Sequence, residues 1–304
     1  MRIISDKRCI IGEGPIWNEK EQKLYYTNGF CNEICMLDIY TGKLTVRQVG
    51  MSCAAFCFDR DNRLIVSGKE GVFFLGQDNV ITSIYDTKKY QISYGNDMKT
   101  GPDGRIYVGT QSEKRNKISD KVDGKLYRID KNGEVSVLLD GLLLSNGMEW
   151  SMDEKRFYHT DSDTNLIREY DFDKINGTIH YTGREIYVPG VDGFTIDTDD
   201  NLFVACWGQG HVAVVDTAKM KIRDYIDVPT QAPASCGFAG KKMEYLAIVT
   251  ATFGLDVEKD LNAGVTFLYK SSAHGRKPYL FQSLPALELN QEGKSVCGEA
   301  DKGD

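Results

Sequence analysis

Short apolar and aromatic segments alternate with polar turns along almost the whole chain of 304 residues. Gly, Asn, Asp and Lys separate these segments, and no long stretch shows the 3.6-residue apolar period of an amphipathic helix. This pattern predicts a chain built from β-strands and tight turns.

The predicted strands recur as a repeat. Each copy holds a short strand, a polar turn, and a second strand that ends in a small or hydroxyl residue; most copies continue into a third strand, and several into an outer one. Such a unit, present six times, is the sequence form of β-propeller blades, so we predict an all-β, six-bladed β-propeller in one domain over residues 1–304. An irregular double sandwich would not explain a repeat that stays in register. The copies start near Glu13, Ala54, Asn96, Asn146, Asp192 and Ala234, which are 41, 42, 50, 46 and 42 residues apart.

The ring needs one further strand to close it. Either the segment 3–11 or the segment 279–283 has the apolar character to supply the outermost strand of the last blade, and the sequence does not choose between them. The polar residues from about 290 onward are expected to form a loose tail.

Composition narrows the functional classes. A net charge of −7 with mixed signs argues against a nucleic-acid partner, and no apolar run reaches the 18 residues that a membrane span needs. The eight cysteines include no CxxC pair, and several lie in apolar runs, which favours buried reduced thiols over zinc ligands. The N-terminus lacks a secretory signal pattern, so we expect a cytoplasmic protein.

Candidate chemistry lies at the first position of the repeats. The innermost strand of a propeller blade runs along the central channel, so these residues should meet at one mouth of it. Four of the six carry a carboxylate or a carboxamide, and such a ring is costly to bury unless a cation occupies its centre. Oxygen ligands favour calcium or magnesium, while the competing interpretation is that these side chains only cap turns. The four are Glu13, Asn96, Asn146 and Asp192.

The loops that follow the second strands should surround the same mouth. The two longest, after Thr110 and Thr250, are predicted to form a lid. Glu113 is the acidic residue on the first of them.

Five stretches, in this order and spacing, make the chain resemble the SMP-30/gluconolactonase/luciferin-regenerating-enzyme family over roughly Cys9 to Tyr269. They read GEGPIWNEKEQKLYYTN, GNDMKTGPDGRIYVGT, SNGMEWSMDEKRFYHTDS, VDGFTIDTDDNLFVACWGQG and ASCGFAGKKMEYLAIVTA. The resemblance implies a six-bladed propeller with a divalent metal held by Glu13, Asn146 and Asp192. It also implies that Asn96 and Glu113 contact substrate.

Two positions depart from the family pattern. Tyr94 stands where sugar-lactonase members usually carry Arg, and Met98 stands where they usually carry Gly. Loss of the guanidinium removes a bidentate donor, which leaves the identity of the substrate open.

The resemblance implies hydrolysis of a sugar-acid lactone, a small-molecule substrate, with Asp192 taking a proton from water and with Asn96, Tyr94 and Glu113 orienting hydroxyls. One divalent ion is expected, calcium first, with magnesium, manganese, zinc and iron(II) as alternatives. A hydrolase of non-sugar lactones or phosphotriesters, and a non-catalytic binding propeller, are the competing hypotheses. No nucleophile elbow, Cys–His arrangement or phosphate-binding glycine loop appears in a suitable context. The sequence does not specify an oligomeric state.

Overall fold

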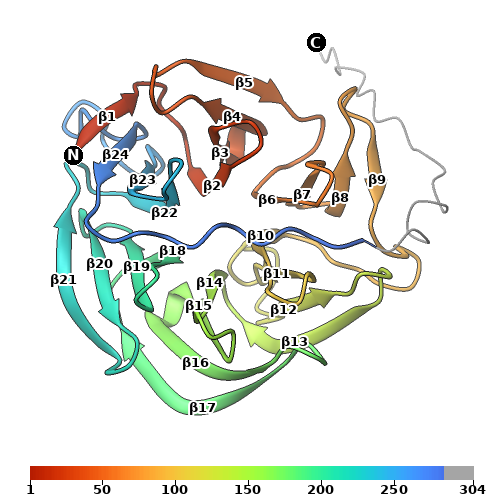
Figure 1. Ribbon diagram of the computed structural model, residues 1–304. Coiled ribbons are helices and arrows are strands. Elements are labelled where there is room, and N and C mark those ends of the chain that lie inside the picture. The colour runs from red at the N-terminus through yellow and green to blue at the C-terminus, as the bar shows by residue number, and fades with distance from the viewer. Residues whose placement is uncertain (284–304) are drawn as a thin grey trace.

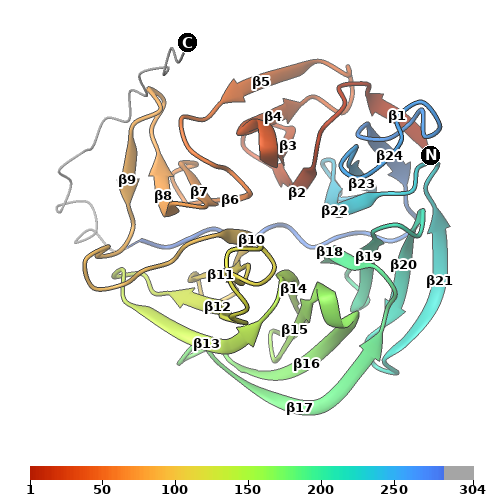
Figure 2. The same ribbon diagram turned by 180° about the vertical axis from the view of Figure 1, so that it is seen from behind.

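The computed structural model describes residues 1–283. Within them, 24 strands form six four-stranded antiparallel sheets arranged as blades around a central channel (Figures 1 and 2). The predicted fold class is confirmed: the protein is an all-β, six-bladed β-propeller. The described residues contain no helix of the length and apolarity that crossing a membrane requires.

The strands follow one another from the channel outward in each blade. Blade 1 contains β2 (Gly12–Asn18), β3 (Lys23–Asn28), β4 (Glu33–Leu37) and β5 (Leu44–Gln48), and blade 2 contains β6 (Ala55–Phe58), β7 (Leu64–Gly68), β8 (Gly71–Leu75) and β9 (Ile81–Ser83). Blade 3 contains β10 (Gly95–Thr100), β11 (Ile106–Thr110), β12 (Gly124–Ile129) and β13 (Val135–Leu142), and blade 4 contains β14 (Ser145–Trp150), β15 (Arg156–Asp161), β16 (Leu166–Asp173) and β17 (Thr178–Tyr187). Blade 5 contains β18 (Val191–Ile196), β19 (Asn201–Cys206), β20 (His211–Asp216) and β21 (Lys221–Asp227), and blade 6 contains β22 (Pro233–Ala239), β23 (Tyr245–Thr250), β24 (Thr266–Lys270) and β1 (Arg2–Ser5).

The N-terminal strand closes the ring. β1 pairs antiparallel with β24, with Ile3 opposite Phe267, and so supplies the outermost strand of blade 6. Of the two segments that the sequence left open for this role, the structure uses the N-terminal one. The expected loose tail from about 290 lies outside the described residues.

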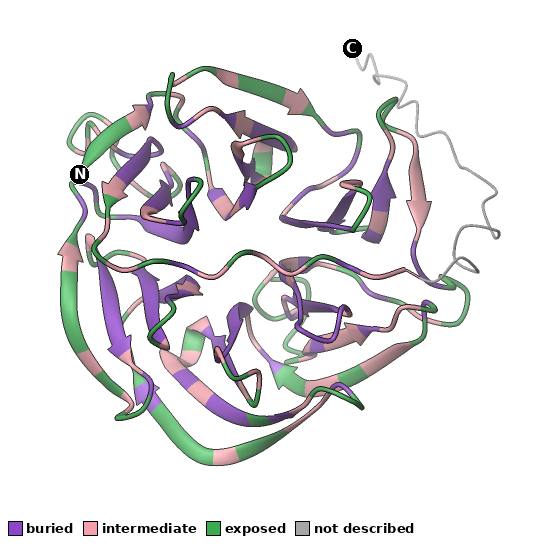
Figure 3. Ribbon diagram, viewed as in Figure 1, coloured by how far each residue is buried: buried purple, intermediate pink, exposed green. Residues whose placement is uncertain are grey.

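Burial explains the strand pattern. The inner strand β14 and the second strand β19 are buried along their whole length, whereas nearly all residues of the outer strand β17 are partly or fully exposed (Figure 3). Between blades 3 and 4 the contact is aromatic: the rings of Tyr107 and Trp150 meet edge to face at 4.9 Å, with Phe157 and Phe172 beside them. Each such buried ring contributes roughly 1.5–3 kcal/mol through loss of apolar surface to water.

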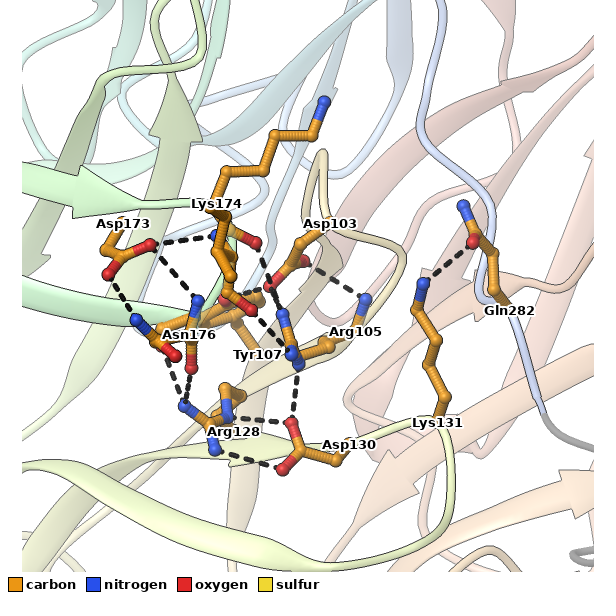
Figure 4. Close-up of polar contacts among 12 residues, drawn as sticks. Asp103, Arg105, Tyr107, Arg128, Asp130, Lys131, Asp173, Lys174, Asn176 and Gln282 are labelled. Carbon is orange, nitrogen blue, oxygen red and sulfur yellow. Dashed lines mark hydrogen bonds and ion pairs between the residues drawn. The ribbon is translucent and has the colours of Figure 1, made fainter.

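A polar network joins the same two blades (Figure 4). Arg105 contacts Asp103 and Asp130 at 2.7 Å each, and Arg128 donates to the carbonyls of Asn176 and Gly177 in the turn between β16 and β17. These bonds tie the turn of blade 4 to a strand of blade 3.

The segment after β24, residues 271–283, which we call the C-terminal strap, crosses the disc from blade 6 to the far side. Figure 1 shows it in strong blue between the two halves of the ring, and it is paler in the reverse view of Figure 2. It contacts the turns between the first and second strands, so it lies over the end of the channel opposite the first residues of the inner strands. Its bonds reach all six blades: Gly275 to Met243, His274 to Thr198, Arg276 to Glu149, Lys277 to Glu19, Phe281 to Phe58, and Gln282 to Gly104.

Candidate active site

The candidate site lies at the entry mouth, by which we mean the end of the channel where the inner strands begin. Glu13, Asn96, Asn146 and Asp192 are each the second residue of their inner strands, β2, β10, β14 and β18. Asn146 and Asp192 are buried, with 4% and 8% of their surface exposed, and Glu13 and Asn96 are partly exposed.

A break in strand pairing accompanies every one of these four residues. The register between the first and second strands shifts next to Glu13 in blade 1, Asn146 in blade 4 and Asp192 in blade 5, and likewise in blades 3 and 6. Blade 2, whose inner strand has no polar residue at the mouth, pairs without a shift. Because a bulge bends a strand and re-aims its side chains, the shifts in blades 1, 3, 4 and 5 help to direct the candidate residues, while blade 6 has a shift without a candidate residue.

Blades 4 and 5 meet at a hydrogen bond between two of the candidates: the Nδ2 of Asn146 donates to the Oδ1 of Asp192. The backbone N–H of Gly147 lies 3.2 Å from the Oδ1 of Asn146. A side chain at Gly147 would overlap the ring of Phe194 and come within 2.5 Å of the carbonyl oxygen of Asp192. The glycine of the SNG motif therefore allows the close approach of the two strands.

Carboxylates act on one another in this mouth. Burial raises the pKa of Glu13 well above its ordinary value, and the neighbouring Asp192 and Asp97 raise it further. Burial also raises the pKa of Asp192 to about 8; the hydrogen bond from Asn146 lowers it, Asp97 raises it, and Arg115 lowers it. Three acidic side chains thus lie close enough to act on one another's pKa values, and a bound cation would relieve their repulsion.

The donor chemistry fits a hard divalent ion. Within residues 1–283 no cluster of three or more His, Cys, Asp or Glu side chains is placed to hold a metal, so a site here depends on the amide oxygen of Asn146 together with the two carboxylates. Such an all-oxygen set, with few protein ligands, suits calcium or magnesium and leaves positions for water or substrate. Glu13, Asn146 and Asp192 are the residues that could hold the ion.

Asn96 is fixed in orientation by a residue that the sequence analysis missed. The Nε2 of Gln111 donates to the Oδ1 of Asn96 at 2.9 Å, and the Nδ2 of Asn96 donates to the carbonyl of Ser145 at 3.0 Å. Asn96 therefore links blade 3 to the strand that carries Asn146. A glutamine directly after the GT that ends the second strand of blade 3 offered no signal of this role.

Asp97 was also missed, although it follows Asn96 directly in the sequence. Burial raises its pKa, and it raises the pKa values of both Glu13 and Asp192. Its position after a predicted site residue, inside the GNDMK stretch, was the available signal.

Tyr94 lies at the entry mouth with a left-handed backbone, at a φ of 55°. The ammonium of Lys69 lies 5.8 Å from the centre of the Tyr94 ring. The backbone N–H of Tyr94 donates to the carbonyl of Lys69. These contacts connect blade 3 to the mouth loop of blade 2. Tyr94 lies two residues before Asn96 in the chain. A contact between Tyr94 and substrate stays a prediction.

Glu113 is held within its own loop, residues 111–123. The hydroxyl of Ser119 donates to its carboxylate at 2.5 Å and Lys121 lies 3.6 Å away, while its backbone N–H donates to Asp123. In the described part of the chain no recorded contact joins it to Glu13, Asn146 or Asp192. Reaching a substrate from this arrangement requires Glu113 to give up its bond to Ser119.

Below the rim, a cavity of about 340 Å³ occupies the lower channel and ends at the C-terminal strap. None of the four rim candidates lines it. Inside it, Glu149 is bonded to Lys99 at 2.7 Å and to Arg276 of the strap at 2.6 Å. Asp97 also lines this cavity, so the lower channel adjoins the rim at that residue.

Comparison with known proteins finds relatives that match most of this chain. The family model described as the SMP-30/gluconolactonase/LRE-like region matches residues 11–252. Regucalcin of Danio rerio is 29% identical over 270 residues, which is 84% of this chain and 89% of that protein, and pentonolactonase XacC of Haloferax volcanii is 28% identical over 257 residues, 82% and 84% of the two chains. The crystal structure of a calcium-binding regucalcin from Agrobacterium tumefaciens superimposes with a TM-score of 0.83 at 22% identity, covering 92% of this chain and 96% of that one.

The resemblance expected from the five motifs is therefore confirmed, since the matched region spans the inner strands of all six blades, from β2 to β22. The chain belongs to the SMP-30/gluconolactonase/LRE-like family.

Proposed function

We propose that the protein is a metal-dependent hydrolase that opens a sugar-acid lactone at the entry mouth. The observation that carries this proposal is the pair of carboxylates at the mouth, Glu13 and Asp192, whose pKa values burial raises and which have the amide of Asn146 between neighbouring blades. Among residues 1–283 no side-chain salt bridge is recorded for either carboxylate. Membership of the family, and a relative named as a pentonolactonase, support the lactone as substrate class.

Glu13, Asn146 and Asp192 would hold the ion, with calcium as our first choice and magnesium, manganese, zinc or iron(II) as alternatives. When bound, a divalent ion supplies a Lewis acid that polarises the lactone carbonyl. A relative described as calcium-binding supports the choice of calcium.

The protein's own groups carry the remaining work. We assign Asp192 as the acceptor of the proton from the attacking water, because it is buried at the mouth. Asn146 fixes the orientation of that carboxylate through its hydrogen bond. Asn96, held by Gln111, would present its remaining N–H toward the substrate's hydroxyls, with Tyr94 and Glu113 contacting the same substrate from the two sides.

A second candidate function is hydrolysis of less polar lactones or of phosphotriesters. The observation in its favour is Tyr94, which puts an aromatic ring at the mouth in place of a guanidinium. Met98 does not support it: only 2% of its surface is exposed, and its side chain packs in the core between blades 2 and 3.

The test is a pH-indicator assay on glucono-, galactono-, xylono- and arabinono-lactone with metal-stripped protein refilled with each of the five ions. We expect metal-dependent acid release from at least one lactone, lost in Glu13→Ala. Silence on all four lactones with metal bound would reject the sugar-lactone assignment and favour the second candidate. Failure to bind any metal would point to a binding propeller without catalysis.

A further inference from the structure

Hydrogen bonds hold the first residues of the loop 111–123 in place at the entry mouth. The backbone N–H of Ser112 donates to the carbonyl of Leu143 at 2.9 Å, and its side-chain oxygen accepts the N–H of Arg115 at 3.0 Å. The Nδ2 of Asn116 donates to the carbonyl of Ser112 at 3.1 Å. The backbone around Arg115 is therefore anchored to the connection between blades 3 and 4.

The side chain of Arg115 reaches toward the next blade. Its Nε lies 3.4 Å from the Oδ1 of Asp163 in the mouth loop of blade 4, the 3-10 turn η2 (Ser162–Thr164), and about half of the side chain (48%) is exposed. In residues 1–283 no other side-chain hydrogen bond or ion pair is recorded for it. A single long contact at this exposure is weak, so a ligand can replace it at small cost.

The start of the same loop is bonded to the candidate site: the Nε2 of Gln111 donates to the Oδ1 of Asn96 at 2.9 Å. The ion pair of Arg115 with Asp163 joins the mouth loops of blades 3 and 4, whose inner strands carry Asn96 and Asn146. The guanidinium therefore lies among the loops that border the candidate residues.

We propose that Arg115 binds the carboxylate of the hydroxy acid formed when the lactone opens. This inference rests on the proposed function, in which water adds its oxygen to the acyl carbon, the ring C–O bond breaks, the ring oxygen leaves as a hydroxyl, and the acid loses its proton. The new anion forms beside Glu13, Asp97 and Asp192. A planar guanidinium with unengaged N–H groups matches a carboxylate through two parallel hydrogen bonds and offsets that repulsion.

The chain offers a matched control for this role. Lys114 is the neighbouring basic residue on the same loop; its side chain is exposed and makes no recorded contact with a described residue. Arg115→Gln and Lys114→Gln remove one positive charge each, one residue apart.

The test is calorimetric binding of gluconate, galactonate, xylonate and arabinonate to the calcium-loaded proteins. We expect the wild type to bind at least one of them and Arg115→Gln to bind it about tenfold or more weakly, as for the loss of a charge-assisted hydrogen bond. Lys114→Gln should stay within about twofold of the wild type, because a mobile surface charge contributes little. All three proteins should still bind calcium, because neither Arg115 nor Lys114 is among the proposed ligands of the ion.

Two results would overturn the inference: no carboxylate binding by the wild type, or equal binding by wild type and Arg115→Gln. Both are distinct from failure of the proposed function, which is read separately from lactone turnover by the wild type. A protein that hydrolyses lactones while Arg115→Gln binds the products normally would keep its function and lose this role for Arg115.

Discussion

At the residue scale, the entry mouth depends on side chains that hold other side chains. Asn146 orients Asp192, Gln111 orients Asn96, and Gly147 leaves the space in which blades 4 and 5 approach. A substitution at any of these positions acts on the candidate site through geometry rather than through its own chemistry.

We predict that Asp192→Ala abolishes both calcium binding and lactone turnover, because it removes one of two carboxylates from a set with three oxygen donors. Asp199→Ala is the matched control, since Asp199 is exposed in the turn at the other end of the same strand pair. Calorimetry with calcium and the pH-indicator assay measure the two losses. A near wild-type rate for Asp192→Ala would contradict the mechanism.

A second residue-scale prediction concerns His159, which is hydrogen-bonded at 2.8 Å to the hydroxyl of Ser145, the residue before Asn146. Burial lowers its pKa to about 3, whereas an unfolded histidine titrates near 6.5. Between these values the unfolded chain binds the extra proton, so stability is fully present above pH 6.5 and falls as the pH drops toward 3.

The slope from this one group approaches about 1.4 kcal/mol per pH unit below pH 6. His159→Gln keeps a polar group at this position without the titration. We therefore expect urea unfolding of that variant to lose less stability between pH 6.5 and 5 than the wild type loses. Equal losses in the two proteins would show that His159 does not govern the acid sensitivity in this range.

At the element scale, what the sequence predicted and what it missed have different physical origins. Second strands are largely buried and apolar, and in every blade a polar turn separates them from the inner strand, so the existence of the strands and their repeat were readable from composition and spacing. The bulges beside Glu13, Asn146 and Asp192 depend on backbone pairing across strands, which no single-chain pattern encodes. Gln111 and Arg115 belong to a loop that is held by contacts with residues of other segments, among them Asp163 of blade 4. Local sequence does not reveal such contacts, so it could not predict where these two side chains lie.

The C-terminal strap illustrates the same limit. The apolar residues of 279–283 suggested a closing strand, but the strap makes only isolated bridges, Phe281 with Asp59 and Gly275 with Asp197. Phe281 is apolar because it is fully buried against Phe74 and the core between blades 2 and 3, with 0% of its surface exposed. The pattern of apolar residues in a short segment does not distinguish a β-strand from an irregular segment that buries one large side chain.

We predict that Phe281→Ala lowers the free energy of unfolding by about 3–5 kcal/mol, the usual cost of emptying a buried phenylalanine site. Leu280→Ala, one residue away and 41% exposed, should change it by less than about 1 kcal/mol. Urea titration followed by tryptophan fluorescence measures both. If the two variants were equally stable, the strap would not be anchored through Phe281.

At the scale of the whole molecule, the two ends of the described chain perform separate tasks. β1 completes the last blade by hydrogen bonding to β24, and the strap ties the turns of all six blades together at the far end of the channel. The sequence identified both segments as candidates for one role. The structure distinguishes the two segments: Ile3 pairs with Phe267 in a continuous strand, whereas the strap forms isolated bridges.

The last prediction follows from ring closure. Removing residues 1–6 deletes β1 and leaves the N–H and C=O groups along β24 without partners, which is an edge that pairs readily with another chain. We expect the truncated protein to melt at a lower temperature and to associate as its concentration rises, measured by calorimetry and by light scattering after size-exclusion chromatography. Arg2→Ala, which removes one hydrogen bond to the carbonyl of Ile39 and leaves β1 in place, should melt close to the wild type and keep its elution volume.

Blade 6 and blade 1 share a hydrophobic core that includes Phe267, Leu37 and Ile39. Loosening β24 should therefore also loosen the blade that carries Glu13, and calcium affinity should fall with it. An intact melting temperature together with an unchanged calcium affinity would mean that three strands suffice to close this ring.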